Sequence, residues 1–226
     1  MFKDCENIVD ASELNLLTNT TDWCYTNMFL GCTQLSAAPI FVATQINKWS
    51  YANMFVKCFA LSTEPTLPAS YLSSHSYSNM FQNCISLSSV PYLYNSRNAP
   101  WMYNAMFEGC ININPLSSFP YASISLNQAT TSGTMSNMFR MCRNNINFAP
   151  RYDINNIRDK TLNFMYDRAN SLNAIEVTFE QWPGNSTTSC WLKDVSPTGV
   201  FVCPSALDTS SRSYNTVPVN WNVLNY

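Results

Sequence analysis

The sequence contains a single histidine, His75, and few charges of either sign. Charged residues make up 12% of the chain, with 12 basic and 14 acidic side chains. Neutralising several phosphates takes a cluster of basic side chains on one face, and these basic residues are scattered and outnumbered by acids. A nucleic-acid partner is therefore not expected. A catalytic triad or a histidine metal site would have to be built around His75 alone.

Long apolar runs are also missing. No stretch approaches the roughly 18 consecutive apolar residues of a membrane-spanning helix, and the N-terminus lacks the basic and apolar segments of a secretory signal. The 5 glycines are isolated, so they form no phosphate-cradling loop. The carboxylates are spread too thinly to nominate a catalytic pair. We expect a non-enzyme with no cofactor, no metal and no membrane insertion.

The chain is nevertheless rich in apolar residues, at 46% hydrophobic and 14% aromatic, which argues against intrinsic disorder. A repeat sets its organisation. The segment Asn-Met-Phe-x-x-Cys-x-x-Leu recurs at 27–35, 53–61 and 79–87, a period of 26 residues. The same positions can be followed to residue 172, with a longer unit whose insertion lies near Gly133.

Each repeat unit is predicted to contain a short helix. Its Met, Cys and Leu stand at i, i+4 and i+7, a spacing that places them on one face of a helix. That face must be buried, so we expect one core that continues from unit to unit. The residues predicted for this core are Met28, Phe29, Cys32, Met54, Phe55, Cys58, Leu61, Met80, Phe81, Cys84, Met106, Phe107 and Cys110.

A proline follows each predicted helix, at Pro39, Pro65 and Pro91. Proline stops a helix and favours extended backbone, which predicts short parallel strands just after it. These strands are expected at 40–43, 66–69 and 92–95. Phe41, Leu67 and Leu93 would point inward, and their neighbours outward.

A single unit buries too little surface to fold alone, whereas stacked units share a core and pair their strands. The predicted fold class is therefore α/β: a leucine-rich-repeat solenoid with one short helix and one short parallel strand per coil. It is expected to span residues 1–173. Residues 174–226 are expected to form a β-rich C-terminal cap, with strand-like runs at 174–179, 190–195, 199–203 and 221–224.

The cysteines fall into two groups. Those that recur once per unit are expected to be packing residues, because a nucleophile or a zinc site would be built once. Cys190 and Cys203 stand apart and could face each other across a hairpin closed near 195–199, as a disulfide or as two free thiols.

The N-terminus fits the repeat as well. Met1, Phe2, Cys5 and Ile8 match the Met, Phe, Cys and Leu positions of the units that follow. We therefore expect the chain to be the C-terminal part of a longer protein with further coils upstream.

The segment Tyr-Thr-Asn-Met-Phe-Leu-Gly-Cys-Thr-Gln-Leu-Ser-Ala-Ala-Pro at 25–39 resembles the leucine-rich repeats of BspA-like surface proteins. The tail at 191–202, with Val217-Pro-Val-Asn-Trp221, is similar to the segment that closes such arrays in gut bacteria and their bacteriophages. The resemblance implies an extracellular adhesion or receptor-binding protein, on a bacterial cell surface or a virion component such as a tail fibre. It implies no shared catalytic residues.

Two positions before the repeat tyrosine, one aromatic residue recurs in each unit. This column consists of Trp23, Trp49, His75 and Trp101. Together with Tyr92, Tyr94 and Arg97 it is the predicted surface for a cell-surface glycan or protein, because half-exposed aromatics anchor such partners. In the alternative, the column only packs under neighbouring loops and the chain is a purely architectural component of a virion or surface layer.

Overall fold

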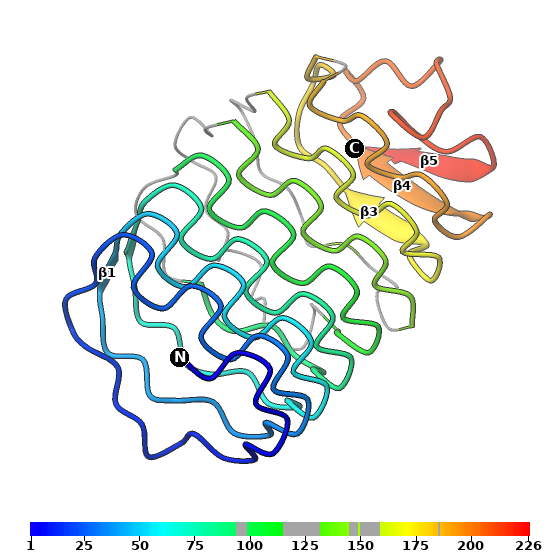
Figure 1. The fold of residues 1–226 in the computed structure, drawn as a ribbon. Helices are drawn as coiled ribbons and strands as arrows, with labels where there is room; N and C mark the ends of the chain where they lie inside the picture. The colour runs from blue at the N-terminus through cyan, green and yellow to red at the C-terminus, as the bar shows by residue number, and fades with distance from the viewer. Residues whose placement is uncertain (94–98, 115–131, 145–148, 150–158, 185) are drawn as a thin grey trace.

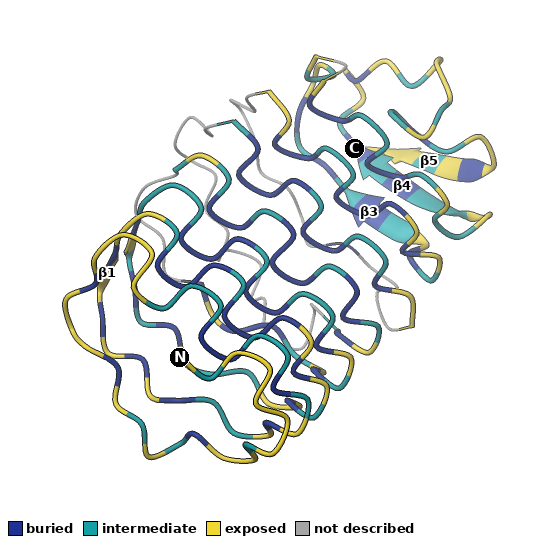
Figure 2. Ribbon diagram, in the orientation of Figure 1, coloured by how far each residue is buried: buried dark blue, intermediate teal, exposed yellow. Residues whose placement is uncertain are grey.

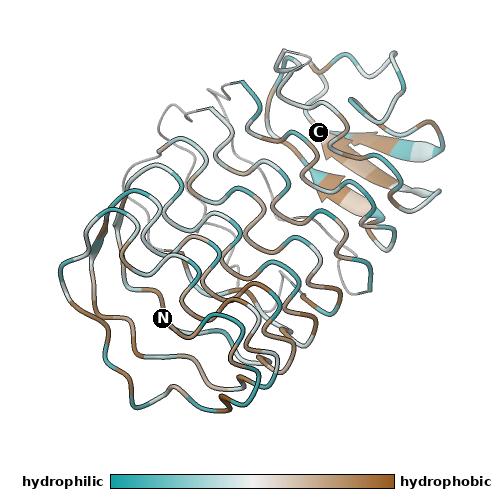
Figure 3. Ribbon diagram, in the orientation of Figure 1, coloured by the Kyte–Doolittle hydropathy of each residue, from teal (hydrophilic) through white to brown (hydrophobic). Residues whose placement is uncertain are grey.

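The repeat units lie side by side in a stack. The computed structural model describes residues 1–93, 99–114, 132–144, 149, 159–184 and 186–226. The N-terminus lies at one end of the stack and the C-terminus at the other (Figure 1). Hydrophobic and hydrophilic residues alternate along each unit rather than forming separate blocks (Figure 3).

The Met-Phe-Cys segment is a chain of tight turns. The amide of Phe55 donates to the carbonyl of Met80 in the next unit at 2.9 Å, whereas the amide of Met54 donates to Tyr51 within its own unit at 3.3 Å. Odd-numbered residues of 49–57 follow the first pattern, and the even-numbered residues between them follow the second. We call this segment, residues 49–57 and the equivalent residues of the other units, the turn ribbon. Its backbone hydrogen bonds are shared between a unit's own turns and the neighbouring unit.

Left-handed residues at every fourth position explain why no helix forms. The φ angles of Trp49, Asn53 and Lys57 are 60°, 56° and 62°. Asn53 and Lys57 each occupy the third position of a turn, where a type II turn needs a positive φ. A helix requires an uninterrupted run of right-handed residues, so the predicted helices are wrong.

The strands are short and all parallel. β1 (Gln45–Ile46) pairs with β2 (Tyr71–Leu72) in a two-stranded sheet. β3 (Ala174–Glu176), β4 (Gly199–Cys203) and β5 (Trp221–Asn225) form a three-stranded sheet in that order. The described residues contain these strands and no helix, so the predicted α/β leucine-rich-repeat solenoid is wrong.

The strands expected directly after Pro39 and Pro65 are wrong as well. Residues 40–43 and 66–69 form no strand, and Ile40 makes only an isolated bridge with Asn15. In these two units the strands, β1 and β2, begin further on, because proline lacks the N–H that a ladder needs. Of the strand expected at 92–95, residues 94 and 95 lie outside the described residues. The predicted alternation of side chains is nevertheless present in these segments. Phe41, Leu67 and Leu93 are buried, whereas Ile40, Thr66 and Tyr92 are exposed.

The C-terminal segment also differs from the prediction. Residues 190–195 form no strand and instead extend the turn ribbon, since the amide of Tyr166 donates to the carbonyl of Trp191 at 2.9 Å. The hairpin expected before Cys203 is absent because β4 pairs in parallel with both neighbours. Cys190 and Cys203 are both free thiols, so of the two alternatives left open by the sequence the disulfide is not formed.

Buried residues recur at matching places in successive units (Figure 2), and their side chains form columns through the core. Every residue predicted for the core is buried. One column consists of stacked rings whose centroids lie between 5.4 and 5.7 Å apart. Its members are Phe2, Phe29, Phe55, Phe81, Phe107, Phe139 and Tyr166. Offset stacking of this kind adds about 0.5–1.5 kcal/mol per pair to the burial of the rings.

The cysteine column bonds each unit to the one before it. The thiol of Cys58 donates to the carbonyl of Phe29 at 3.2 Å, and that of Cys84 to the carbonyl of Phe55 at 3.0 Å. Burial, with a smaller contribution from the Cys32 thiol, raises the pKa of Cys58 to about 12. The thiol is small enough for the core and still satisfies a buried carbonyl.

The column thiols should therefore resist alkylation in the folded protein. At pH 8, a bulky maleimide is expected to label the exposed Cys5 and Cys24 quickly, and Cys58, Cys84 and Cys110 only at the rate of unfolding. Mass spectrometry of tryptic peptides at successive times measures this difference. Labelling of Cys84 as fast as Cys24 would contradict a closed core.

Candidate functional site

The predicted aromatic column is a stack of rings, with one ring from each of four successive units. Trp23 and Trp49 lie 4.8 Å apart and 5° from parallel, and Trp49 and His75 lie 3.8 Å apart at 12°. The centroid of His75 lies 6.3 Å from that of Trp101. Trp23 is 57% exposed, and the other three are half-buried. The structure thus brings the four predicted residues together.

This stacking limits what the column can bind. Carbon atoms in contact lie about 3.5–4.0 Å apart, so no sugar ring fits between Trp23 and Trp49 or between Trp49 and His75. From Trp23 to His75 the column therefore presents ring edges to solvent, except for the outer face of Trp23. In the unit after Trp101, Gly133 occupies the position of the column residue. A Cβ at Gly133 would run into the indole of Trp101.

His75 is fixed by a neighbouring hydroxyl. Ser74 Oγ lies 2.7 Å from His75 Nδ1 and 3.0 Å from the carbonyl oxygen of Pro100. A hydroxyl has one proton and a carbonyl can only accept, so Ser74 donates to Pro100 and accepts from Nδ1–H. Ser74 is therefore an anchor for the ring rather than an activated nucleophile.

Stability should depend on the protonation of His75. Burial lowers its pKa, so the folded protein binds this proton less readily than the unfolded chain, in which the histidine pKa is about 6.5. Stability is then fully present above pH 6.5 and falls as the pH drops towards the lowered pKa. Thermal midpoints at pH 7.5 and 5.5 measure the effect. His75→Trp, which matches the other column residues, should remove this fall, and an unchanged pH dependence would contradict the assignment.

Tyr92 lies away from the aromatic column. It is 43% exposed and lines a groove to which no column residue contributes. Tyr94 and Arg97 lie outside the described residues. Among the described residues, the structure therefore separates Tyr92 from the aromatic column.

Two adjoining grooves are lined by the prolines that recur once per unit. Pro39 and Pro65 line the first groove, and Pro65 and Pro91 line the second. The first has a volume of about 400 Å³ and the second about 270 Å³. The first is lined by Ser36, Ala37, Ala38, Pro39, Ile40, Phe41, Thr63, Glu64, Pro65 and Thr66. The second is lined by Glu64, Pro65, Thr66, Leu67, Val90, Pro91 and Tyr92. Because they share three residues, we treat them as one surface, the proline groove.

The proline groove combines apolar and hydrogen-bonding groups. Ile40 is 47% exposed at one end, and Tyr92 stands at the other. Glu64, in the middle, supplies the only carboxylate among the described residues of the lining, and none of these described residues is basic. The Ser89 hydroxyl donates to Glu64 Oε2 and thereby orients the carboxylate. The groove therefore offers an acceptor, hydroxyls and apolar surface, and it disfavours anions.

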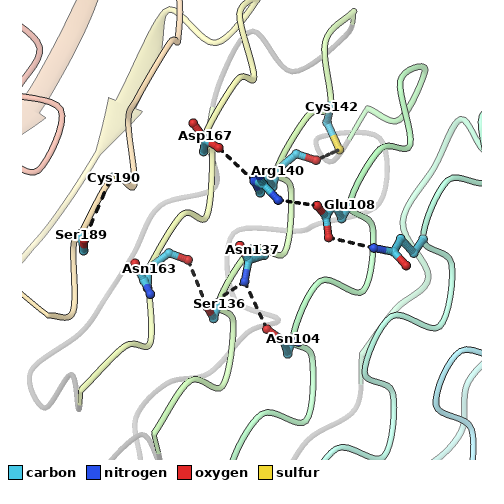
Figure 4. A network of polar contacts seen from close by, with 11 residues as sticks. Asn104, Glu108, Ser136, Asn137, Arg140, Cys142, Asn163, Asp167, Ser189 and Cys190 are labelled. Carbon is cyan, nitrogen blue, oxygen red and sulfur yellow. Dashed lines mark hydrogen bonds and ion pairs between the residues drawn. The ribbon is translucent and has the colours of Figure 1, made fainter.

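A charged cluster that the sequence analysis missed lies on the turn ribbon (Figure 4). The Arg140 guanidinium forms ion pairs of 2.9 Å with Glu108 and with Asp167, whose side chain is 3% exposed. Gln82 extends the cluster by donating to Glu108 at 2.9 Å. All four residues stand two positions after a repeat methionine. The register alone could have placed them in one column.

Nothing in the described residues indicates a metal or a membrane span. They contain no group of three or more His, Cys, Asp or Glu side chains arranged to hold an ion. Within the same part of the chain no helix is long and apolar enough to cross a bilayer. Comparisons with family models, with curated proteins and with solved structures find no match to this chain.

Proposed function

We propose that this chain is a non-enzymatic recognition module that binds a cell-surface glycan or protein through the proline groove. The observation that carries the proposal is the pair of adjoining grooves with exposed Ile40 and Tyr92 at their ends. A groove of about 400 Å³ is within the usual size range of ligand sites. Apolar walls with a few placed polar groups are typical of such sites.

The chemistry of the groove favours a neutral ligand rich in hydroxyls or amides. A tyrosine ring packs against the C–H face of a sugar or against an apolar side chain. The Glu64 carboxylate accepts strong hydrogen bonds from ligand hydroxyls or amides. An acidic ligand would have to approach Glu64, and no described residue of the lining supplies a compensating cation. The proposal therefore favours neutral glycans and uncharged protein loops.

The setting of this interaction is also part of the proposal. The resemblance to BspA-like surface proteins supports display outside the cell, on a bacterial surface or a bacteriophage virion. The chain carries few charges, which agrees with a neutral ligand. Binding of such a ligand depends little on ionic strength. A purely architectural role is the second candidate, favoured by the exposed apolar residues at the N-terminal end of the stack.

Tyr92→Ala should weaken attachment at least about tenfold, because it removes the largest exposed anchor of the groove. The measurement is binding of the fluorescently labelled protein to intact bacteria and to an array of neutral glycans. Tyr71→Ala is the matched control, since Tyr71 is 49% exposed but does not line the groove.

Two outcomes would overturn the groove as the binding surface. In one, Tyr92→Ala binds as well as the unmodified chain. In the other, substitution of Trp49 and Trp101 with alanine abolishes attachment at an unchanged thermal midpoint, which would place the site on the aromatic column. Failure of every form to bind cells or glycans would favour the architectural role.

A further inference from the structure

A small pocket lies between two segments near the C-terminus, and it shares no lining residue with the proline groove. Its volume is about 210 Å³, and its lining comes from the segments 192–197 and 214–220. The first segment leads into β4 and the second into β5 (Figure 1). The two segments converge because the first residues of these strands, Gly199 and Trp221, are paired. We call this hollow the C-terminal pocket.

Two buried tryptophans hold the walls of the C-terminal pocket together. The Trp191 indole donates to the carbonyl of Thr216 in the second segment at 3.2 Å. The Trp221 indole donates to the carbonyl of Ser196 in the first segment at 2.9 Å. Each bond ties one segment to the other, so the pocket is already formed without a ligand. A pre-formed pocket lowers the entropic cost of binding.

The lining combines an aromatic ring with apolar and polar groups. Tyr214 is 51% exposed, and Val219 is 71% exposed. Asp194 supplies the only carboxylate of the lining, and Asn220 supplies an amide that can both donate and accept hydrogen bonds. The C-terminal pocket therefore offers aromatic and apolar surface, a strong acceptor and a donor.

The charges around the C-terminal pocket favour a neutral ligand. An anion would meet Asp194, and none of the residues that line the pocket is basic. A cation would meet Arg212, whose guanidinium donates to the carbonyl of Trp221 at 3.2 Å. Trp221 directly follows Asn220 of the lining, so this positive charge lies beside the pocket.

The size of the C-terminal pocket favours a small ligand. Sites for drug-sized molecules have volumes of about 300–1,000 Å³. At about 210 Å³ the C-terminal pocket suits a single ring with its substituents rather than a longer chain.

We infer that the C-terminal pocket binds one neutral pyranose ring of a glycan. The Tyr214 ring would pack against the C–H face of the sugar, as amphipathic aromatic rings do. Asp194 would accept charge-assisted hydrogen bonds from the sugar hydroxyls, and Asn220 would donate to them. The inference does not rest on the proline groove as a binding surface, because the two sites share no lining residue.

NMR titration of the isotope-labelled chain with single sugars tests this inference. The probes are the methyl glycosides of glucose, galactose, mannose and N-acetylglucosamine. At least one of them should shift the backbone amide signals of Asp194, Val195 and Val219 with millimolar affinity. Tyr214→Ala should weaken that binding at least about tenfold, because it removes the ring. The backbone carbonyl of Tyr214, which accepts from the amide of Leu192, stays in place in this variant.

Asp194→Asn is the second test variant. Asn suits the φ angle of 54° at this position and keeps the size of the side chain, but it removes the charge. We expect it to weaken binding of the sugar about fivefold. Tyr71→Ala and Tyr92→Ala are the controls, since neither tyrosine lines the C-terminal pocket, and both should bind the sugar as the unmodified chain does.

Three results would overturn the inference. In the first, none of these sugars shifts the signals of the C-terminal pocket, or Tyr214→Ala leaves the shifts unchanged. In the second, the cationic probe N-acetyl-lysine methylamide binds there more tightly than any of the sugars. In the third, Tyr92→Ala abolishes sugar binding and Tyr214→Ala does not, which would place the sugar in the proline groove. Loss of binding in Tyr214→Ala alone supports the C-terminal pocket even if Tyr92→Ala has no effect on attachment to cells.

Discussion

Phe55→Ala is expected to lower the free energy of unfolding by about 3–5 kcal/mol. Phe55 is fully buried and stacks on Phe29 at 5.7 Å and on Phe81 at 5.5 Å. Its removal opens a cavity in the middle of the ring column and ends two stacking contacts. The turn-ribbon backbone cannot collapse into the gap, because its spacing is fixed by hydrogen bonds to both neighbouring units. Urea unfolding followed by tryptophan fluorescence measures the loss.

Phe59→Ala is the matched control. Phe59 lies four residues further along the same unit and is 38% exposed, so its removal should change stability by only about 0.5 kcal/mol. Similar losses for the two variants would contradict the ring column as a main source of stability.

Arg140→Met should cost about 1.5–3 kcal/mol. The substitution keeps the aliphatic stem but leaves Glu108 and the buried Asp167 without their shared cation. The cost is moderated by solvent, since the Arg140 side chain is 31% exposed. Arg143→Met is the control, because Arg143 is exposed and forms no ion pair within the described residues. Adding Glu108→Gln and Asp167→Asn to Arg140→Met should recover part of the lost stability. Equal stability of Arg140→Met and Arg143→Met would show that the ion pairs contribute nothing.

The period and the core residues could be found in the sequence, but the conformation of the repeat could not. Met28, Cys32 and Leu35 at i, i+4 and i+7 fit a helix face. They also fit the turn ribbon, in which positive φ angles recur every four residues at Trp23, Asn27 and Gly31 and Leu35 closes a further turn on the carbonyl of Cys32. A stripe of three apolar residues does not by itself distinguish the two conformations. The discriminating signal was the recurrence of Asn27 and Gly31 at positions that favour positive φ.

The candidate site was only partly within reach of sequence reasoning. Recurrence placed Trp23 and Trp49 in one column, but it could not show whether the rings lie face to face or splay apart. The proline groove depends on how far neighbouring loops stand from each other, which no local pattern encodes. For this reason nothing in the sequence marked Glu64 as a site residue, although it lines both halves of the groove.

Scalar couplings across hydrogen bonds, measured by NMR on the deuterated protein, test the shared-backbone stack most directly. The account predicts a coupling between the amide nitrogen of Phe55 and the carbonyl carbon of Met80, whose oxygen lies 2.9 Å from that nitrogen. A coupling from Phe55 to the carbonyl carbon of Tyr51, four residues earlier, would show an α-helix and contradict the account.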